Sequence, residues 1–391
     1  MADAIKTGKK PDGATFYWFR ISAGRNPVTR KRIQVYKSFG KLKDAKTEYA
    51  KIMNAISEQR YVAKDGITVA DYLDRWAHAH SRDLEATTAA KNRHLLRPVR
   101  ELLGDRSVQS LTRADIDALA DWMLTSGRRR VGKPGTALSA RTVKDTLTLF
   151  QRACDDAIDE RLMMINPVRK VKRPKQTKPD HDQWSDDEAA RFEKMAAQDR
   201  LSPVITLQCL GLRPEEVCGL RWHHVNLIAM TLSIRAARTL ADGQPVEKAT
   251  KTPRGTRVLP LDDTLLRDLK AFKALQARES AAAGQAYDPA GNYVLCDELG
   301  KPFAPDKLRR VWYRLMRQAG VPKITPYTAS RHAAGTYLDR VGVSPGVIAA
   351  WLGHTDASFT MKTYVHPRPE DLAAARDALA ARRARKDDGE R

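Results

Sequence analysis

A short basic segment constrains this sequence most, because it prevents the chain from folding as a single domain. Val168–Lys175 directly follows Asn166 and Pro167, is bounded by prolines and is poor in apolar residues. Such a composition is typical of an extended linker rather than of a packed element. We therefore expect separate domains on its two sides, joined by an interdomain linker over residues 167–183.

The charge of the chain narrows the possible functions. Its 391 residues carry a formal net charge of +22, and the basic side chains are spread along the sequence rather than confined to one tail. This distribution favours a polyanionic partner, with nucleic acid ahead of an anionic membrane. There is no secretory signal and no run of about 18 apolar residues that could span a bilayer. The four cysteines lack metal-ligand spacing, so we expect a soluble cytoplasmic protein without a metal site.

Residues 1–64 predict a small basic domain. Aromatic and β-branched residues predict strands over 15–21 and 32–37, and helical spacing of apolar residues predicts a helix over 43–59. Basic side chains surround this short sheet, among them Arg25, Arg30, Lys31 and Arg32. We expect the sheet to enter a DNA groove as β-ribbon readers do, the alternative being a solvated basic face.

Residues 65–166 predict a compact all-α domain of four amphipathic helices, the first capped by Thr68 and the others over 86–103, 112–126 and 139–160. Its basic, glycine-rich loop contains Arg128, Arg129 and Arg130. This loop is interpreted equally well as a clamp on a phosphate backbone or as a solvated loop. The linker cations Lys170, Lys172 and Arg173 are expected to track DNA between domains.

Residues 184–391 predict a third, mostly helical domain, beginning with a capping box at Ser185 and Glu188. Two strands are expected at 231–236 and 256–261, flanking a loop with Lys248 and Lys251. Further predicted helices cover 263–280, 305–319, 329–341, 344–352 and 356–364, and a terminal amphipathic helix covers 369–385.

The chemistry is expected between Thr325 and His366. This stretch contains the pair Arg331–His332, the triplet Leu352–Gly353–His354 and an isolated Tyr364. A tyrosine becomes a covalent nucleophile when cationic and hydrogen-bonding groups hold the group that it attacks. Arginine, histidine and tyrosine close together therefore suggest attack on a phosphodiester.

Together with the segment around residues 211–222, these motifs resemble the tyrosine recombinase family, specifically phage-type integrases with three domains. The match consists of Gly211–Leu212–Arg213 with Glu216 and Leu220–Arg221–Trp222, Lys251–Thr252 before Arg257–Val258–Leu259–Pro260–Leu261, Arg331–His332, Leu352–Gly353–His354 and Tyr364. Each motif alone is weak, but all of them in this order are specific, and the resemblance covers essentially the whole chain.

The resemblance implies an α+β multidomain protein with the tyrosine recombinase fold. Its parts would be an arm-type DNA-binding domain of a three-stranded sheet and one helix (1–64), a core-binding domain of four helices (65–166) and a mostly α catalytic domain with a small antiparallel sheet (184–391). No cofactor, ATP or metal is implied.

The resemblance also implies a role for each matching residue. Arg213 and Arg331 would hold the scissile phosphate, and Lys251 would protonate the departing 5′ oxygen. His354 would hydrogen-bond the phosphate or assist the nucleophile, Tyr364. Glu216 and His332 would have structural roles, holding the catalytic side chains in position without contacting the substrate. Alternatives are Lys248 for the lysine, Tyr327 or Tyr337 for the nucleophile, and plain structural roles for Arg213 and His354.

One position departs from the family pattern. The family usually has a histidine three residues before the second arginine, where this chain has Thr328. Either Thr328 occupies that place, or a shift of one residue offers the hydroxyl of Tyr327. Positioning and charge stabilisation carry most of phosphoryl-transfer catalysis, so the site is expected to work without this imidazole.

The sequence thus predicts a site-specific DNA recombinase, a phage-type integrase acting through a 3′-phosphotyrosyl intermediate. The implied partners are core and arm sites on double-stranded DNA, three further copies in a tetramer, a host DNA-bending protein and a directionality factor. The alternatives are a Xer-like or transposon-resolving recombinase, and a catalytically degenerate DNA-binding accessory protein.

Overall fold

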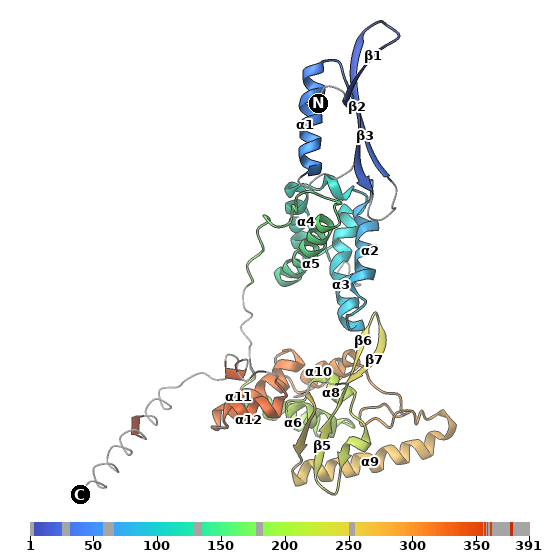
Figure 1. Cartoon of the computed structure of the whole chain (residues 1–391). Coiled ribbons are helices and arrows are strands. Elements are labelled where there is room, and N and C mark those ends of the chain that lie inside the picture. The colour runs from blue at the N-terminus through green and yellow to red at the C-terminus, as the bar shows by residue number, and fades with distance from the viewer. Residues whose placement is uncertain are drawn as a thin grey trace, which may run out of the picture. The chain divides into compact units, whose positions relative to one another are not determined.

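The computed structural model places most of the chain in two compact units, residues 1–178 and 179–391. The residues that it describes are 4–25, 32–57, 66–128, 135–176, 183–249, 255–354, 356, 358, 360, 361, 376 and 377 (Figure 1).

The N-terminal part of the first unit is a three-stranded antiparallel sheet with one helix alongside it (Figure 1). Its elements are β1 (Ile5–Lys9), β2 (Thr15–Arg25), β3 (Arg32–Phe39) and α1 (Leu42–Ser57). Alternation along β2 places Phe19 on the face toward the helix, where it packs near Ile52 and Tyr49. The predicted sheet and helix are confirmed.

The opposite face of this sheet is aromatic and basic. Trp18 of β2 lies beside Tyr36 of β3, with ring centroids 5.5 Å apart, and Tyr36 is 54% exposed. The ammonium group of Lys6 lies 5.3 Å from the centre of the Trp18 ring. This face therefore presents stacking surfaces and positive charge to solvent.

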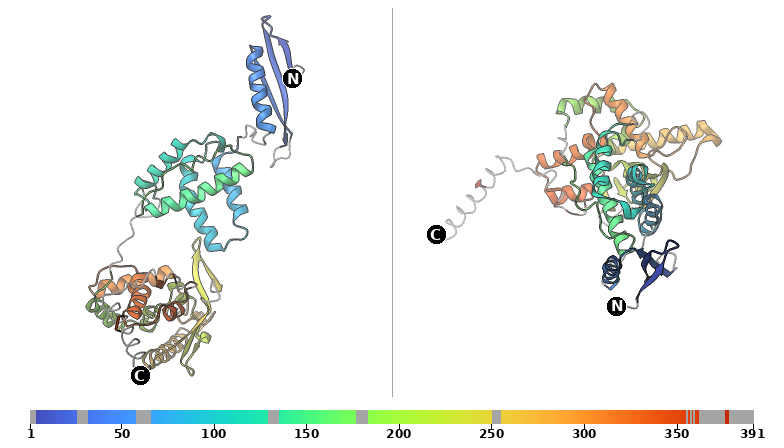
Figure 2. Two further views of the ribbon diagram at one scale, coloured as in Figure 1. Left: turned by 60° about the vertical axis from the view of Figure 1, so that its left-hand side comes forward. Right: turned by 90° about the horizontal axis from the view of Figure 1, so that it is seen from above.

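The helical part of the first unit contains α2 (Val69–His80), α3 (Ala86–Leu103), α4 (Arg113–Thr125) and α5 (Ala140–Asp159), seen packed together in Figure 2. All four lie close to the predicted ranges. Their starts follow local chemistry, because the hydroxyls of Thr68, Thr112 and Ser139 each accept a backbone N–H from the first turn.

The start of the predicted linker differs from the expectation of an extended chain. Val168 and Val171 are buried in the core of the helical part. Asn166 fixes this turn by donating to the carbonyl oxygen of Gln151 at 2.8 Å, and its own oxygen accepts the N–H of Val168. Arg173 also turns inward and donates to the side chain of Gln151. Two valines in a basic segment were thus enough to anchor it.

The second unit combines short helices with two small antiparallel sheets. Its helices are α6 (Asp186–Ala196), α7 (Ser202–Cys209), α8 (Pro214–Cys218), α9 (Asp263–Ala283), α10 (Pro305–Gln318), α11 (Ala333–Arg340) and α12 (Pro345–Leu352). Strands β4 (Val225–Asn226), β5 (Thr231–Ile234) and β8 (Arg257–Pro260) form one sheet, and β6 (Ala236–Ala241) and β7 (Gln244–Ala249) form the other. In the core, Phe192 stacks on Trp312, whose indole N–H donates to Gln208.

Two segments depart from their predicted conformations. The predicted loop between the two strands is largely the β6–β7 hairpin, so Lys248 lies on a strand. The predicted helix over 329–341 begins as a π-helix, Thr328–His332, before α11 follows. The spacing of apolar residues along the sequence predicts neither the hairpin nor the π-helix.

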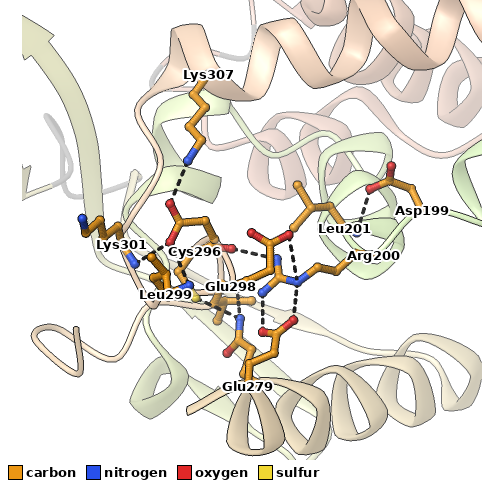
Figure 3. Close-up of polar contacts among 12 residues, drawn as sticks. Asp199, Arg200, Leu201, Glu279, Cys296, Glu298, Leu299, Lys301 and Lys307 are labelled. Atoms are coloured by element: carbon orange, nitrogen blue, oxygen red, sulfur yellow. Dashed lines mark hydrogen bonds and ion pairs between the residues drawn. The ribbon is translucent and has the colours of Figure 1, made fainter. Parts of the chain in front are cut away.

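A partly buried ion pair joins the C-terminal end of α9 to the segment before α7 (Figure 3). The guanidinium of Arg200 donates to both carboxylate oxygens of Glu279, each at 2.6 Å, and to the carbonyl oxygen of Cys296. The two side chains are only 18% and 15% exposed. This bidentate pair ties the long helix to the body of the unit.

We expect Arg200→Met to lower the free energy of unfolding by about 2–4 kcal/mol, because Glu279 would remain as an unpaired, mostly buried charge. Urea unfolding of the full chain measures this loss. The matched double variant, Arg200→Met with Glu279→Met, is expected to recover a large part of it. An equal or larger loss in the double variant would contradict this account.

Candidate active site

The first predicted arginine lies at the start of α8. Gly211 has a φ of +97°, and a Cβ added there would lie 2.6 Å from a methyl carbon of Leu352. Only glycine therefore lets this turn approach the end of α12. Arg213 follows at the N-terminus of α8, before Pro214 in the first turn. Its guanidinium donates to Glu216 at 2.7 Å and to the carbonyl oxygen of Gly353 at 3.1 Å.

The second predicted arginine is fully buried. Arg331 lies in the π-helix and donates to the carbonyl oxygen of Gly211 at 2.6 Å and to that of Leu352 at 2.5 Å. Burial lowers the pKa of Arg331, and the positive charge of Arg213 adds to this effect. Its Nε is buried and has no hydrogen-bond partner in the part of the chain that the structure describes.

A third arginine, Arg257 at the start of β8, completes the group. Both of its terminal nitrogens donate to Glu216, at 3.0 and 3.1 Å, and its Nε donates to the carbonyl oxygen of Trp351 at 2.7 Å. The sequence analysis noted Arg257 only as part of a strand motif. An arginine at the start of a short strand gives no information about its partners.

These side chains share one support, the C-terminal end of α12. Gly353 ends the helix in the left-handed conformation, with φ 66° and ψ 46°. The carbonyl oxygens of residues 351, 352 and 353 then accept from three different guanidinium groups. The partial negative charge of a helix C-terminus favours this arrangement. We call Arg213, Arg257 and Arg331 the arginine cluster.

Glu216 is the carboxylate at the centre of the arginine cluster. It is 4% exposed and accepts hydrogen bonds from Arg213 and Arg257. Burial alone would raise the pKa of Glu216, but the hydrogen bonds and charge of Arg257, with the charge of Arg213, lower it overall. Among the described residues, three guanidinium groups thus face one carboxylate, and an anion would balance the remaining charge.

His354 follows α12 directly and is 7% exposed. Its Nδ1 lies 2.7 Å from the hydroxyl oxygen of Thr360, which fixes the plane of the ring. Burial, followed by the charges of Arg331 and Arg213, lowers the pKa of His354 to about 4. The imidazole is therefore neutral at pH 7, so it can accept a proton.

The structure also describes Thr328, which stands where the family usually has a histidine. Thr328 is 6% exposed, and its hydroxyl lies 2.7 Å from that of Thr325. The preceding Tyr327 is 41% exposed, whereas His332 is half-buried. The structure thus buries the threonine and exposes the tyrosine.

Several predicted residues lie outside the described part of the chain: Lys251, Tyr364, Arg30, Lys31, Arg129 and Arg130, together with the side chain of Arg25 and most of the predicted terminal helix. Of the described DNA-contact candidates, Arg32, Lys170 and Lys172 are exposed, and Arg128 is half-buried. Arg173 donates to the helical core instead.

Comparison with known proteins identifies a domain of a known family. Residues 188–371 match the model of the phage integrase family. This part of the chain is a phage integrase domain. A XerC-like tyrosine recombinase of Caldanaerobacter subterraneus subsp. tengcongensis is 24% identical over 402 residues, covering 96% of this chain and 98% of the relative. The ICEBs1 integrase of Bacillus subtilis is also 24% identical, covering 93% and 96%.

A solved structure supports the same fold. The Tn1549 transposon integrase, determined in complex with transposon right end DNA, matches with a TM-score of 0.64 at 19% identity. The match covers 80% of this chain and 99% of that one. The tyrosine recombinase fold predicted from the sequence is thereby confirmed.

The described residues contain neither a membrane span nor a cluster of metal ligands. None of the described helices combines the length and apolar composition of a membrane span. Within the same residues, no three or more His, Cys, Asp or Glu side chains gather as metal ligands do.

The depressed pKa of His354 predicts a dependence of stability on pH. The unfolded chain takes up this proton near pH 6.5, whereas the folded chain takes it up near pH 4. Stability should therefore be complete above pH 6.5 and fall toward pH 4, by at most about 1.4 kcal/mol per pH unit.

His354→Asn should flatten this part of the curve, and the difference between the two proteins isolates the effect, because His80 and His224 also have lowered pKa values. Chemical unfolding at several pH values measures both curves. Parallel curves would show that the site does not hold this imidazole neutral.

Proposed function

We propose that this protein is a site-specific DNA recombinase of the phage integrase type, which cleaves and rejoins DNA through a 3′-phosphotyrosyl intermediate. The arginine cluster is the observation that carries the proposal. Three guanidinium groups converge on one helix end with a single carboxylate among the described residues. Such a group is suited to hold a phosphodiester, because arginine forks match phosphate oxygens.

In this mechanism the arginines stabilise the charge that develops on the phosphate. Arg213, whose side chain is 34% exposed, and the buried Arg331 would contact the non-bridging oxygens. Glu216 and Arg257 hold the cluster in place, since Arg257 bridges Glu216 and α12. Hydrogen bonds to the end of α12 fix the three arginines relative to one another, which orients them as a group.

The covalent step is proposed to use Tyr364, His354 and Lys251. The phenolic oxygen of Tyr364 attacks phosphorus, and its proton passes to a base; His354 is the proposed acceptor, because its neutral imidazole has an unprotonated nitrogen. The bond from phosphorus to the 5′ oxygen breaks, and that oxygen takes a proton from Lys251. The phosphotyrosyl ester retains the energy of the broken bond, so a 5′ hydroxyl of a partner strand can reverse the step without ATP.

Incubation of the purified full chain with a nicked suicide substrate tests the proposal. Wild type should form a covalent protein–DNA adduct, whereas Tyr364→Phe should form none, because phenylalanine has no nucleophilic oxygen. Tyr337→Phe, which removes the hydroxyl of an exposed tyrosine on α11, is the matched control and should react as wild type does. Adduct formation by Tyr364→Phe would exclude Tyr364 as the nucleophile.

The DNA substrate is proposed to contact several surfaces of the chain. Arg128, Lys170 and Lys172 remain candidates in the helical part, whose predicted role is binding of the core site. The outward face of the N-terminal sheet, with Trp18, Tyr36 and Arg32, is suited to a groove at arm sites. Binding through phosphate contacts would depend strongly on salt.

Deletion of residues 1–64 is expected to abolish binding to arm sites while core-site cleavage continues, because the N-terminal sheet has its own small core. Gel-shift assays on arm DNA and adduct assays on core DNA measure the two activities separately. Loss of core cleavage with retained arm binding would contradict the proposed division into domains.

Exchange between two duplexes requires four strand cleavages, so four protomers are proposed to act together. A groove of about 670 Å³ lies between α6, α7, α11 and α12, lined in part by Trp184, Leu338 and Trp351. The predicted terminal helix of a neighbouring protomer, apolar at Leu372 and Leu379, is the proposed occupant. A host DNA-bending protein and a directionality factor are further proposed partners, in a bacterial cytoplasm.

A recombinase that resolves chromosomes or mobile elements is the second candidate. The XerC-like relative favours it, because the match extends over 96% of this chain and so includes the N-terminal region. The presence of that region therefore does not separate the two functions. Mapping the DNA sequence that the protein protects would distinguish attachment sites from resolution sites.

A further inference from the structure

The residues around Arg331 follow an unusual backbone path. Thr328–His332 form a π-helix, in which hydrogen bonds join residues i and i+5 instead of i and i+4. One more residue is therefore needed for each turn. Residues four apart in this segment take the relative positions that residues three apart have in an α-helix. Single π-turns of this kind are frequent at functional sites.

Tyr327 lies four residues before Arg331. In this turn it therefore takes the position relative to Arg331 that a residue three before it would have in an α-helix. It directly precedes the π-helix with helical φ and ψ of −64° and −41°. Its side chain is 41% exposed, and its hydroxyl makes no hydrogen bond to any other described residue. It is also close enough to Arg331 to act on it electrostatically: burial and Arg213 lower the pKa of Arg331, and Tyr327 partly opposes them.

Thr328 is poorly placed to contact a substrate at this site. Its hydroxyl pairs with that of Thr325, and the hydroxyl of Thr325 also accepts the backbone N–H of Thr328. With only 6% of its surface exposed, it serves to hold the start of the turn. The two alternatives that the sequence left open for the missing histidine are therefore unequal in the structure.

We infer that Tyr327 is a substrate-contacting residue of this site, whose phenol donates a hydrogen bond to a non-bridging oxygen of the phosphate held by Arg331. This inference rests on the proposed function. No proton is transferred in this contact. The phenol keeps its proton and adds a hydrogen bond to a charged acceptor.

Single-turnover cleavage of a nicked suicide substrate by the full chain tests the inference. Tyr327→Phe should slow adduct formation by about 10- to 100-fold, the usual effect of losing a hydrogen bond to a charged group. The adduct should still form at the same tyrosine. Tyr337→Phe is the matched control, because it removes the hydroxyl of an exposed tyrosine on α11, and it should stay within about twofold of wild type, well below that effect.

A second measurement separates contact with the phosphate from a structural role. Each methylphosphonate diastereomer of the scissile phosphate lacks one non-bridging oxygen. On the diastereomer without the contacted oxygen, Tyr327→Phe and wild type should react at equal rates, although both are slow. A structural role would give the same ratio of rates on every substrate. Tyr327→His should restore part of the rate and introduce a dependence on pH near 6.5.

The outcomes separate this inference from the proposed function. If wild type forms an adduct at Tyr364 and Tyr327→Phe matches its rate, the inference alone is wrong. It is equally wrong if the rate ratio is the same on all substrates, or if the adduct maps to Tyr327 itself. If wild type forms no adduct at all, the proposed function and the inference fall together.

Discussion

The contact between the arginine cluster and the C-terminal end of α12 is the interaction on which the rest of the second unit depends. The three guanidinium groups come from the start of α8, the start of β8 and the π-helix, which are far apart in the sequence. Each donates to a different carbonyl oxygen at the end of the same helix. One helix end thus sets the positions of three side chains that no local interaction could bring together.

Like charges held this closely require compensation. Glu216 supplies part of it through paired hydrogen bonds to Arg257 and one to Arg213. The helix carbonyls supply more, but as dipoles rather than as full charges. Burial, followed by the charges of Arg331 and Arg213, depresses the pKa of His354, so a neutral imidazole and guanidinium groups coexist within one site.

The sequence predicted the elements whose ends are decided locally. The helices that begin at Thr68, Ser139 and Ser185 carry their caps in the first turn, and the structure places them where those caps indicate. The structure also brings Arg213, Arg331 and His354, which the motifs singled out, to one helix end or just after it, while their catalytic roles stay predictions. Lys251 and Tyr364 lie outside the described residues, so their places in the site remain predictions.

Features that depend on distant partners were not predictable in this way. Val168 and Val171 are buried because the helical part provides an apolar surface for them. The basic composition of their segment predicted an exposed linker instead. The role of Arg257 depends on Glu216 and Trp351, distant in sequence. The π-helix had one sign in the sequence: either Thr328 or Tyr327 could take the place of the missing histidine before Arg331. The spacing of apolar residues could not decide between them.

The close approach at Gly211 has a consequence for engineering. Even one methyl group there would press against Leu352 and separate the turn before α8 from the helix end that orients the arginines. A library that diversifies this unit would therefore lose many members at residue 211 for steric reasons alone. The outward face of the N-terminal sheet has no such restriction at Tyr36, which is half-exposed, so retargeting by directed evolution has more freedom there.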